Sequence, residues 1–161
     1  MKTEKKILSR AEAKTSVENW KNQGNEVVFT NGCFDILHLG HIDYLEKAKE
    51  KGDRLIVALN TDQSVKELKG EDRPINNEYS RARLIAALEF VDGIVLFHEE
   101  TPKELIEEIL PDILVKGSDY DLSNIVGADT VIDHGGKVET IDLVDGYSTT
   151  NIVDKIKSSK E

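Results

Sequence analysis

Two histidines and two glycines in one short stretch, residues 27–41, are the residues best suited to chemistry. His38 and His41 lie three residues apart, so at the start of a helix both imidazoles can face one ligand as hydrogen-bond donors. Gly32 allows the backbone to approach that ligand, and Gly40 lets the chain turn into the helix with free N–H groups. Such N–H groups and the positive end of a helix dipole favour phosphate. The stretch therefore predicts a phosphate-binding corner.

The residues around this corner predict a strand, a loop and a helix. Residues 26–31 are rich in β-branched residues, and from residue 39 to 51 apolar residues recur at helical spacing. Further strands are expected at 54–60, 93–97, 112–116 and 137–141, and further helices at 9–23, 62–69, 77–90, 101–110, 127–134 and 151–158. Alternating strands and helices indicate right-handed βαβ units. We therefore expect an α/β fold with one Rossmann-like, doubly wound parallel sheet of about five strands flanked by helices, and with ligands at the carboxyl ends of the strands.

The residues at the helix ends, the length of the chain and its apolar runs predict the helix caps, the number of domains and the location. Ser9 is the expected N-cap of the first helix and Gly24 follows its end, while Thr101 and Pro102 are expected to cap and open the 101–110 helix. We expect residues 1–161 to form a single domain, with residues 1–24 as an N-terminal helical extension packed on it. No apolar run approaches the length of a bilayer span, and the first residues lack the apolar segment of a signal peptide, so a cytoplasmic location is expected.

The formal net charge of −10 argues against nonspecific binding to nucleic acid, which needs a basic face. A polyanionic ligand must then be held by locally clustered cations, assisted by a divalent metal. The candidate cations are Lys66, Lys69, Arg73, Arg81, Arg83 and Lys116. The single cysteine, Cys33, excludes an intrachain disulfide and is interpreted as a small filler side chain rather than a nucleophile.

A second motif, Gly146-Tyr147-Ser148-Thr149-Thr150, precedes the last expected helix. Hydroxyl side chains at a helix start often serve only as an N-cap. Three successive hydroxyls after a glycine can also hold phosphate, together with the free N–H groups of the helix. Both interpretations remain open from the residues alone.

The string Gly32-x-Phe34-Asp35-x-x-His38-x-Gly40-His41 resembles the signature of the nucleotidylyltransferase superfamily, whose H-x-G-H motif binds phosphate. The resemblance implies that Ser148-Thr149-Thr150 holds the triphosphate, and Lys155 stands where the superfamily has a following basic residue. Glycerol 3-phosphate cytidylyltransferases carry an Arg-Thr pair before the hydroxyl motif, whereas this chain has Leu143-Val144. This difference favours a nucleotide donor other than CTP.

The remaining motifs are similar to those of the adenylyltransferases that make ADP-heptose from D-glycero-D-manno-heptose 1-phosphate. The similarity extends over residues 7–157 and rests on Asn60-Thr61-Asp62, Lys69-Gly70, residues 73–76, Arg81-Ala82, Val91-Asp92 and residues 116–120. Ser118 replaces a glycine that this family usually carries. No sugar-kinase domain fits in 161 residues, so the chain resembles the stand-alone form of the enzyme.

The resemblance implies transfer of AMP from ATP to a sugar 1-phosphate, with release of pyrophosphate, for the synthesis of lipopolysaccharide. It assigns a catalytic role to His38, His41, Lys69 and Arg81. It assigns nucleotide binding to Asn31, Gly32, Cys33, Phe34, Gly40, Lys116, Gly117, Ser148, Thr149 and Thr150. It assigns substrate binding to Asp35, Asn60, Asp62, Arg73, Asp119 and Tyr120. Asp35 has the alternative role of a side chain that stabilises its own turn.

The expected cofactor is Mg²⁺, bridged by the phosphates rather than held by protein side chains. The expected ligands are ATP and a sugar phosphate, with no nucleic acid and no membrane, and a homodimer or higher homo-oligomer is expected. The polar segment from Lys66 to Asn76 is expected to be mobile and to close over bound phosphates. Two alternatives remain, a cytidylyltransferase acting on glycerol 3-phosphate or a similar alcohol phosphate, and a non-catalytic nucleotide-binding regulator.

Overall fold

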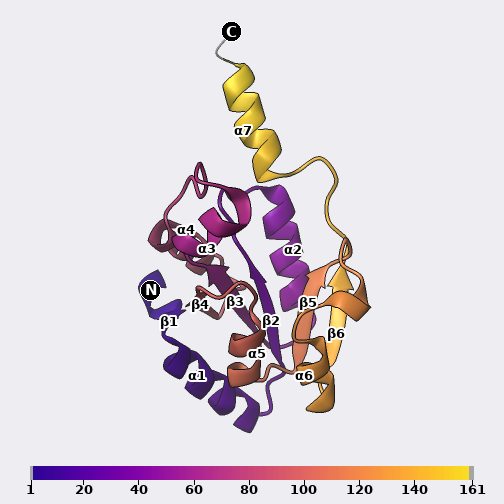
Figure 1. The fold of residues 1–161 in the computed structure, drawn as a ribbon. Helices are drawn as coiled ribbons and strands as arrows, with labels where there is room; N and C mark the ends of the chain where they lie inside the picture. Colours follow the sequence, from indigo (N-terminus) through magenta and orange to yellow (C-terminus); the bar gives the residue numbers. More distant parts are fainter. Residues whose placement is uncertain (1, 160–161) are drawn as a thin grey trace.

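Six parallel strands form one sheet in a computed structural model of the chain, which describes residues 2–159. The strands lie in the order β1-β4-β3-β2-β5-β6 (Figure 1). Their bounds are Ile7–Leu8 for β1, Val27–Gly32 for β2, Arg54–Asn60 for β3, Gly93–Phe97 for β4, Ile113–Gly117 for β5 and Lys137–Ile141 for β6. The chain first builds outward from β2 to β3 and β4 and then returns to place β5 on the other side of β2. The strand order therefore reverses between β2 and β5, where open α/β sheets bind their ligands.

Helices cover both faces of the sheet. Their bounds are Arg10–Asn22 for α1, Leu39–Lys49 for α2, Asp62–Lys69 for α3, Glu78–Ala86 for α4, Lys103–Ile109 for α5, Ala128–Asp133 for α6 and Thr149–Ser158 for α7, with short 3₁₀ helices η1 at Thr3–Lys6 and η2 at Leu122–Asn124. Helices α2 and α4 bury apolar side chains against one face, while α1, α5 and α6 bury theirs against the other. Successive side chains of each central strand point to opposite faces of the sheet and enter the two cores in turn. Both faces are covered, which explains why the central strands are almost entirely apolar.

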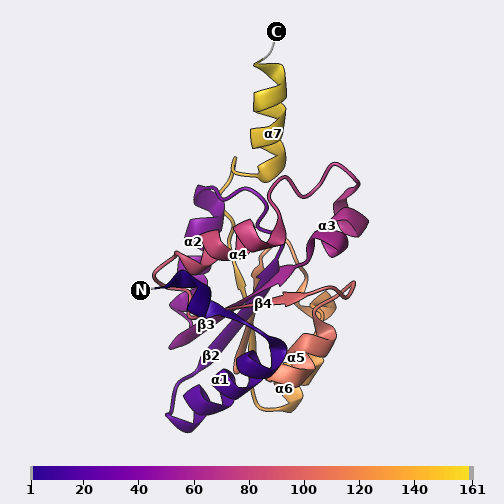
Figure 2. The same cartoon turned by 90° about the vertical axis from the view of Figure 1, so that its left-hand side faces the viewer.

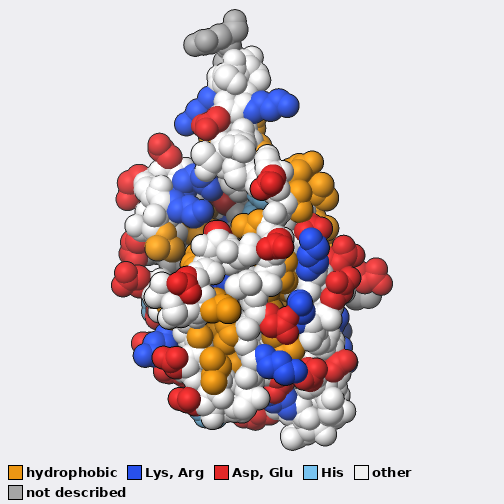
Figure 3. Space-filling view, turned by 90° about the vertical axis from the view of Figure 1, so that its right-hand side faces the viewer, with side chains coloured by type: hydrophobic (Ala, Val, Ile, Leu, Met, Phe, Trp, Pro, Cys, Tyr) orange, Lys and Arg blue, Asp and Glu red, His pale blue; other side chains and the backbone are white. Residues whose placement is uncertain are grey.

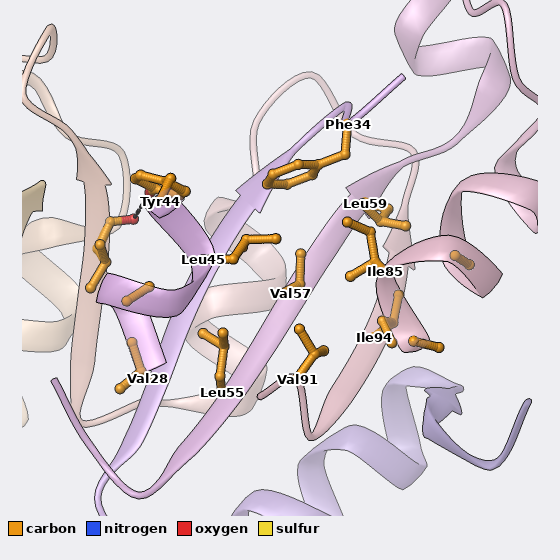
Figure 4. Packing of buried hydrophobic residues seen from close by; sticks show 14 of the residues in the cluster. Val28, Phe34, Tyr44, Leu45, Leu55, Val57, Leu59, Ile85, Val91 and Ile94 are labelled. Atoms are coloured by element: carbon orange, nitrogen blue, oxygen red, sulfur yellow. Dashed lines mark hydrogen bonds between the residues drawn. The ribbon is translucent and has the colours of Figure 1, made fainter. Parts of the chain in front are cut away.

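The core beneath α2 and α4 positions the phosphate-binding corner. Leu45 of α2 and Ile85 of α4 are fully buried and pack over Val57 of β3 (Figure 4). Phe34, in the loop after β2, extends this core toward the end of the sheet. Burial of each such side chain contributes about 1.5–3 kcal/mol to stability, so the start of α2 is held firmly against the sheet.

The last helix, α7, has a different environment. It projects away from the body of the molecule in both ribbon views (Figures 1 and 2), and none of its residues is buried. Only its N-terminal end, at residues 148–150, reaches the cavity beside the β2–α2 loop. The helix is thus attached to the body mainly by the residues that precede it.

The doubly wound parallel sheet is confirmed, with two corrections. The sheet has six strands because the two-residue strand β1 pairs with β4 at the edge, and two residues are too few to show a period. The N-terminal residues therefore add a strand as well as a helix. The expected N-cap Ser9 is confirmed, with a capping box to Glu12. The expected cap at Thr101 is wrong, since Pro102 occupies the N-cap of α5 without a side-chain hydrogen bond.

The expected single domain over residues 1–161 stays a prediction, and Met1, Lys160 and Glu161 lie outside the described residues. The helix expected at 77–90 ends earlier, at Ala86. In residues 2–159 no helix is both long and apolar enough to cross a membrane.

Candidate active site

A cavity of about 430 Å³ lies at the carboxyl ends of β2 and β5, where the strand order reverses. Its wall comes from the end of β2 and the following loop, the first turn of α2, the end of α3, the loop before α4, the end of β5 and the segment before α7. The lining residues are Asn31, Gly32, Cys33, Phe34, Asp35, His38, Gly40, His41, Tyr44, Lys69, Arg73, Lys116, Gly117, Asp119, Tyr120, Leu143, Val144, Tyr147, Ser148, Thr149 and Thr150. The space-filling view shows a hollow beneath α7, with basic and histidine side chains at its edge (Figure 3).

The two histidines of the H-x-G-H motif stack on each other at this cavity. His38 is the N-cap residue of α2 and His41 lies in its first turn, and their ring centroids are 3.7 Å apart with planes inclined by 21°. The ring of Phe34 meets His41 edge-on, with centroids 5.0 Å apart. The Nδ1 atoms of both histidines are buried without a hydrogen-bond partner within residues 2–159. Because these atoms have no partner, both rings retain unused hydrogen-bonding capacity beside the cavity. Unpaired buried polar atoms are costly and need an explanation, which a ligand in the cavity would supply.

Both histidines are neutral in the free protein near pH 7. Burial, with smaller contributions from His38 and Lys69, lowers the pKa of His41 from 6.5 to about 4. Burial also lowers the pKa of His38. A neutral imidazole still carries one N–H donor, so each ring can donate a hydrogen bond without bearing charge.

Two residues of the motif, Gly40 and Phe34, have unusual conformational constraints. A Cβ atom on Gly40 would lie 3.1 Å from Nδ1 of His38 and 3.2 Å from Cβ of Tyr147, so a larger residue would displace the histidine. Phe34 has a φ of 47°, in the left-handed region that non-glycine residues seldom adopt. Such backbone conformations persist where the surrounding structure fixes them, commonly at functional sites.

Three cationic side chains line the cavity. Lys116 donates a hydrogen bond to Oδ1 of Asn31, and its Nζ lies 5.3 Å from the centre of the Tyr120 ring. Burial lowers the pKa of Lys116 to about 8. Lys69 is exposed at the last residue of α3, and Arg73 is half-buried in the loop before α4. Of the six cations predicted to hold a polyanionic ligand, these three line the cavity, whereas Lys66, Arg81 and Arg83 do not.

Asp35 anchors the loop that carries Arg73. Its carboxylate accepts hydrogen bonds from the backbone N–H groups of Ile75 and Asn76, at 2.9 Å, and from Nε of Arg73, at 2.7 Å. Burial raises the pKa of Asp35, but the hydrogen bonds from Asn76, Ile75 and Arg73 outweigh it and the net pKa is lowered. Asp35 thus holds a distant loop rather than its own turn, and it fixes one end of the Lys66–Asn76 segment, whose expected mobility stays a prediction.

Three predicted site residues lie behind the cavity and do not line it. Arg81 is fully buried and bonded to other protein groups, among them Oδ1 of Asp62 at 2.8 Å. Asn60 is buried, and its Nδ2 donates to Oγ of Ser64 at 2.9 Å. Asn60 ends β3 and Asp62 follows it, so both lie at the correct edge of the sheet, whereas Arg81 lies within α4. The direction of each side chain depends on packing that the motif spacing does not report.

Four lining residues were not predicted as site residues. Tyr44, one turn after His41 on α2, is buried and its hydroxyl lies 2.7 Å from Oγ1 of Thr30. Burial raises the pKa of Tyr44 to about 12, so it stays protonated. Leu143, Val144 and Tyr147 come from the segment before α7. The helical spacing from His41 and the position of Tyr147 beside Ser148 were signals that could have identified two of them.

The N-cap interpretation of the hydroxyl motif is confirmed, and its role in holding phosphate stays a prediction. Oγ of Ser148 accepts a hydrogen bond from the backbone N–H of Asn151 at 3.0 Å, so Ser148 is the N-cap of α7. Ser148, Thr149 and Thr150 all line the cavity as well. Lys155 is exposed further along α7 and does not line it.

The fold and the cavity define a class of protein, the nucleotidylyltransferase-type α/β domain with an H-x-G-H corner at the switch point of a parallel sheet. Comparison with known families agrees, because residues 29–155 match the family described as cytidylyltransferase-like. The chain belongs to this cytidylyltransferase-like family of nucleotidylyltransferases, and the resemblance seen in the motifs is confirmed at that level.

Curated relatives and solved structures add detail. The chain is 56% identical over 157 residues to the bifunctional protein HldE of Campylobacter jejuni subsp. doylei, covering 98% of this chain and 32% of that protein. It is 55% identical over 142 residues to the bifunctional protein HldE of Methylobacillus flagellatus, covering 88% of this chain and 29% of that protein. The chain thus spans about a third of the length of the curated relatives it matches.

A crystal structure of the lipopolysaccharide core biosynthesis protein of Thermoplasma volcanium has a TM-score of 0.62 and 35% identity, covering 78% of this chain and all of that one. Pantoate-beta-alanine ligase of Francisella tularensis, 15% identical with a TM-score of 0.59, covers 96% of this chain and 78% of that one and shares the fold.

Proposed function

We propose that this chain transfers AMP from ATP to a sugar 1-phosphate, D-glycero-D-manno-heptose 1-phosphate, giving ADP-heptose and pyrophosphate for lipopolysaccharide synthesis. The observation that carries the proposal is the convergence in one cavity of two neutral histidines, three cationic side chains and the hydroxyls at the start of α7. The 53–56% identity to bifunctional HldE proteins supports the choice of substrate.

The proposed reaction needs no enzyme nucleophile. An oxygen of the sugar phosphate attacks the α-phosphorus of ATP in line, the bond from that phosphorus to the bridging oxygen breaks, and pyrophosphate leaves with the electron pair. A phosphate monoester has its second pKa at about 6, so its attacking oxygen is already deprotonated near neutral pH. Catalysis then depends on positioning the two phosphates and on stabilising the charge that develops.

The residues of the cavity supply these two functions. His38 and His41 donate N–H hydrogen bonds to the oxygens of the transferred phosphate, where charge develops in the transition state. The N-terminal end of α7, with Ser148 and Thr149, holds the β- and γ-phosphates. Lys69 and Arg73 face the sugar phosphate, and Lys116 adds positive charge at the end of β5. These roles remain proposals from position and chemistry.

Mg²⁺ is the proposed cofactor. Within the described part of the chain, no three His, Cys, Asp or Glu side chains form a group able to hold a metal ion. Mg²⁺ prefers oxygen ligands and usually binds through substrate phosphates and retained waters, so the residues present fit an ion that enters with ATP. When bound, the ion neutralises phosphate charge, which matters in a protein with a net charge of −10.

The adenine base is proposed over cytosine because Leu143 and Val144 line the cavity where cytidylyltransferases carry an Arg-Thr pair.

We further propose a cytoplasmic site of action, where ATP is available, and a homodimer or higher homo-oligomer. On α7, Ile156 is exposed and Ile152 and Val153 are half-buried, which supports self-association.

The proposal is tested by incubating the purified chain with each nucleoside triphosphate and a panel of sugar phosphates while measuring pyrophosphate release. We expect turnover with ATP and heptose 1-phosphate, and no release when the sugar phosphate is omitted. Turnover with CTP and glycerol 3-phosphate instead would replace the adenylyltransferase assignment. Tight nucleotide binding without turnover on any sugar phosphate would favour a regulator.

A further inference from the structure

Arg81 of α4 is the largest of the fully buried side chains in residues 2–159. A guanidinium group carries five N–H donors and a permanent charge, so its burial is costly unless those donors are paired. An arginine that clamps a substrate phosphate would instead face the cavity. The burial of Arg81 therefore needs another explanation.

Four acceptors surround the guanidinium group. Nε donates to the backbone carbonyl of Asn76 at 3.0 Å, and Nη1 donates to the carbonyls of Cys33 and Asn60, each at 2.8 Å. Nη2 donates to Oδ1 of Asp62 at 2.8 Å. These acceptors lie in the loop after β2, at the end of β3, at the start of α3 and in the loop before α4. Arg81 thus joins four segments from behind the cavity.

The network continues from Asn76 into the cavity. The backbone N–H of Asn76 donates to Oδ1 of Asp35 at 2.9 Å, and its Nδ2 donates to the carbonyl of Asp35 at 2.8 Å. The same carboxylate accepts Nε of Arg73 at 2.7 Å, while the two Nη groups of Arg73 have no hydrogen-bond partner within residues 2–159. Arg73 is therefore fixed through Nε, with the rest of its planar fork available at the cavity wall.

We propose that Arg81 is a positioning residue, which fixes the 73–76 loop through Asn76 and Asp35 so that Arg73, and not Arg81, binds the phosphate of the sugar phosphate. The proposal rests on the function proposed above. The planar guanidinium of Arg73 matches two phosphate oxygens, and a fork that is already oriented loses less entropy on binding. Arg81 acts on the substrate only through this loop.

The test compares Arg81→Lys with the matched control Arg83→Lys. Lysine keeps the charge but lacks the fork, so it cannot hold the four acceptors together. Arg83 lies on the same helix, bonds to Thr3 and Glu4, and does not line the cavity. Two readouts are taken: hydrogen exchange at the amides of residues 75 and 76, and pyrophosphate release at varied ATP and heptose 1-phosphate.

With Arg81→Lys we expect exchange at both amides to accelerate about tenfold or more, because the loop opens more often. We also expect the KM for the sugar phosphate to rise about 10- to 100-fold, as misplaced binding groups do, with the KM for ATP changed less than about threefold. Arg83→Lys should leave both readouts at wild-type values. Exchange that stays at the wild-type rate, or a loss of kcat with an unchanged KM for the sugar phosphate, would overturn the proposal.

A second variant keeps the test decisive if Arg81→Lys does not fold, as judged by circular dichroism. Asp62→Asn weakens one of the four bonds and leaves the three backbone acceptors, so it should shift both readouts in the same direction by a smaller factor. Wild-type values for Asp62→Asn in that case would overturn the proposal. If the wild-type chain released no pyrophosphate with any sugar 1-phosphate, the proposed function would fail, and amide exchange in Arg81→Lys or Asp62→Asn would still decide the positioning role.

Discussion

Replacing His41 with glutamine should change how the stability of the protein depends on pH. Burial lowers the pKa of His41 from 6.5 to about 4 in the folded state, so the unfolded chain binds a proton more readily at this residue. Stability that is present above pH 6.5 is therefore lost as the pH falls toward 4. Glutamine cannot titrate, so the variant lacks this loss.

The size of the effect follows from linkage between protonation and unfolding. A shift from 6.5 to about 4 corresponds to about 2.5 kcal/mol lost from the free energy of unfolding near pH 4.5, relative to pH 8. Urea unfolding of the wild type and of His41→Gln at several pH values between 8 and 4.5 measures it. The stability difference between the two proteins should shift by about this amount in favour of the variant as the solution is acidified.

A matched control is His98→Gln, because His98 is largely exposed, with 77% of its side chain accessible. Its curve should follow that of the wild type within about 0.5 kcal/mol. If the curves of His41→Gln and the wild type stayed parallel from pH 8 to 4.5, then His41 would not be neutral through burial, and the role of a neutral N–H donor would have to be abandoned.

Three further predictions concern catalysis. His38→Ala should lower kcat by about two to three orders of magnitude while ATP binding, measured by calorimetry, weakens less; a near wild-type kcat would remove His38 from the mechanism. Lys69→Ala should raise the KM for the sugar phosphate and lower kcat together, since this exposed lysine at the end of α3 can close on bound phosphate; kinetics like those of the wild type would refute that closure. Chelation by EDTA should abolish pyrophosphate release and added Mg²⁺ should restore it; full activity in EDTA would show that the cationic side chains suffice.

The fold was accessible from the sequence because its signals are local. Buried central strands give apolar runs, amphipathic helices give a helical period, and the phosphate corner combines glycines and histidines within a few residues. The edge strand at Ile7 and Leu8 was missed because its pairing partner, β4, is distant in the chain and its own length is too short for a pattern.

The candidate site was accessible to a lesser degree. Motif spacing brought the correct segments to one edge of the sheet, but it could not separate an arginine that faces the cavity from one that is buried behind it. Arg73 lies in the loop before α4 and Arg81 lies within α4, and only the burial of Arg81 and the acceptors around it reveal its position. Similarly, the motif spacing did not report that Asp35, which lines the cavity, bonds to a loop forty residues later.

The parallel sheet also determines when the cavity can exist during folding. Parallel strands pair only after a crossover, so each ladder joins residues far apart in the chain, and such contacts form slowly. Ile7 cannot pair until Ile94 has been synthesised, and the corner at His38 lacks its opposite wall until the segment before α7 is present. On a ribosome that adds about 5–20 residues per second, the histidine corner would be exposed for several seconds before its opposite wall could form.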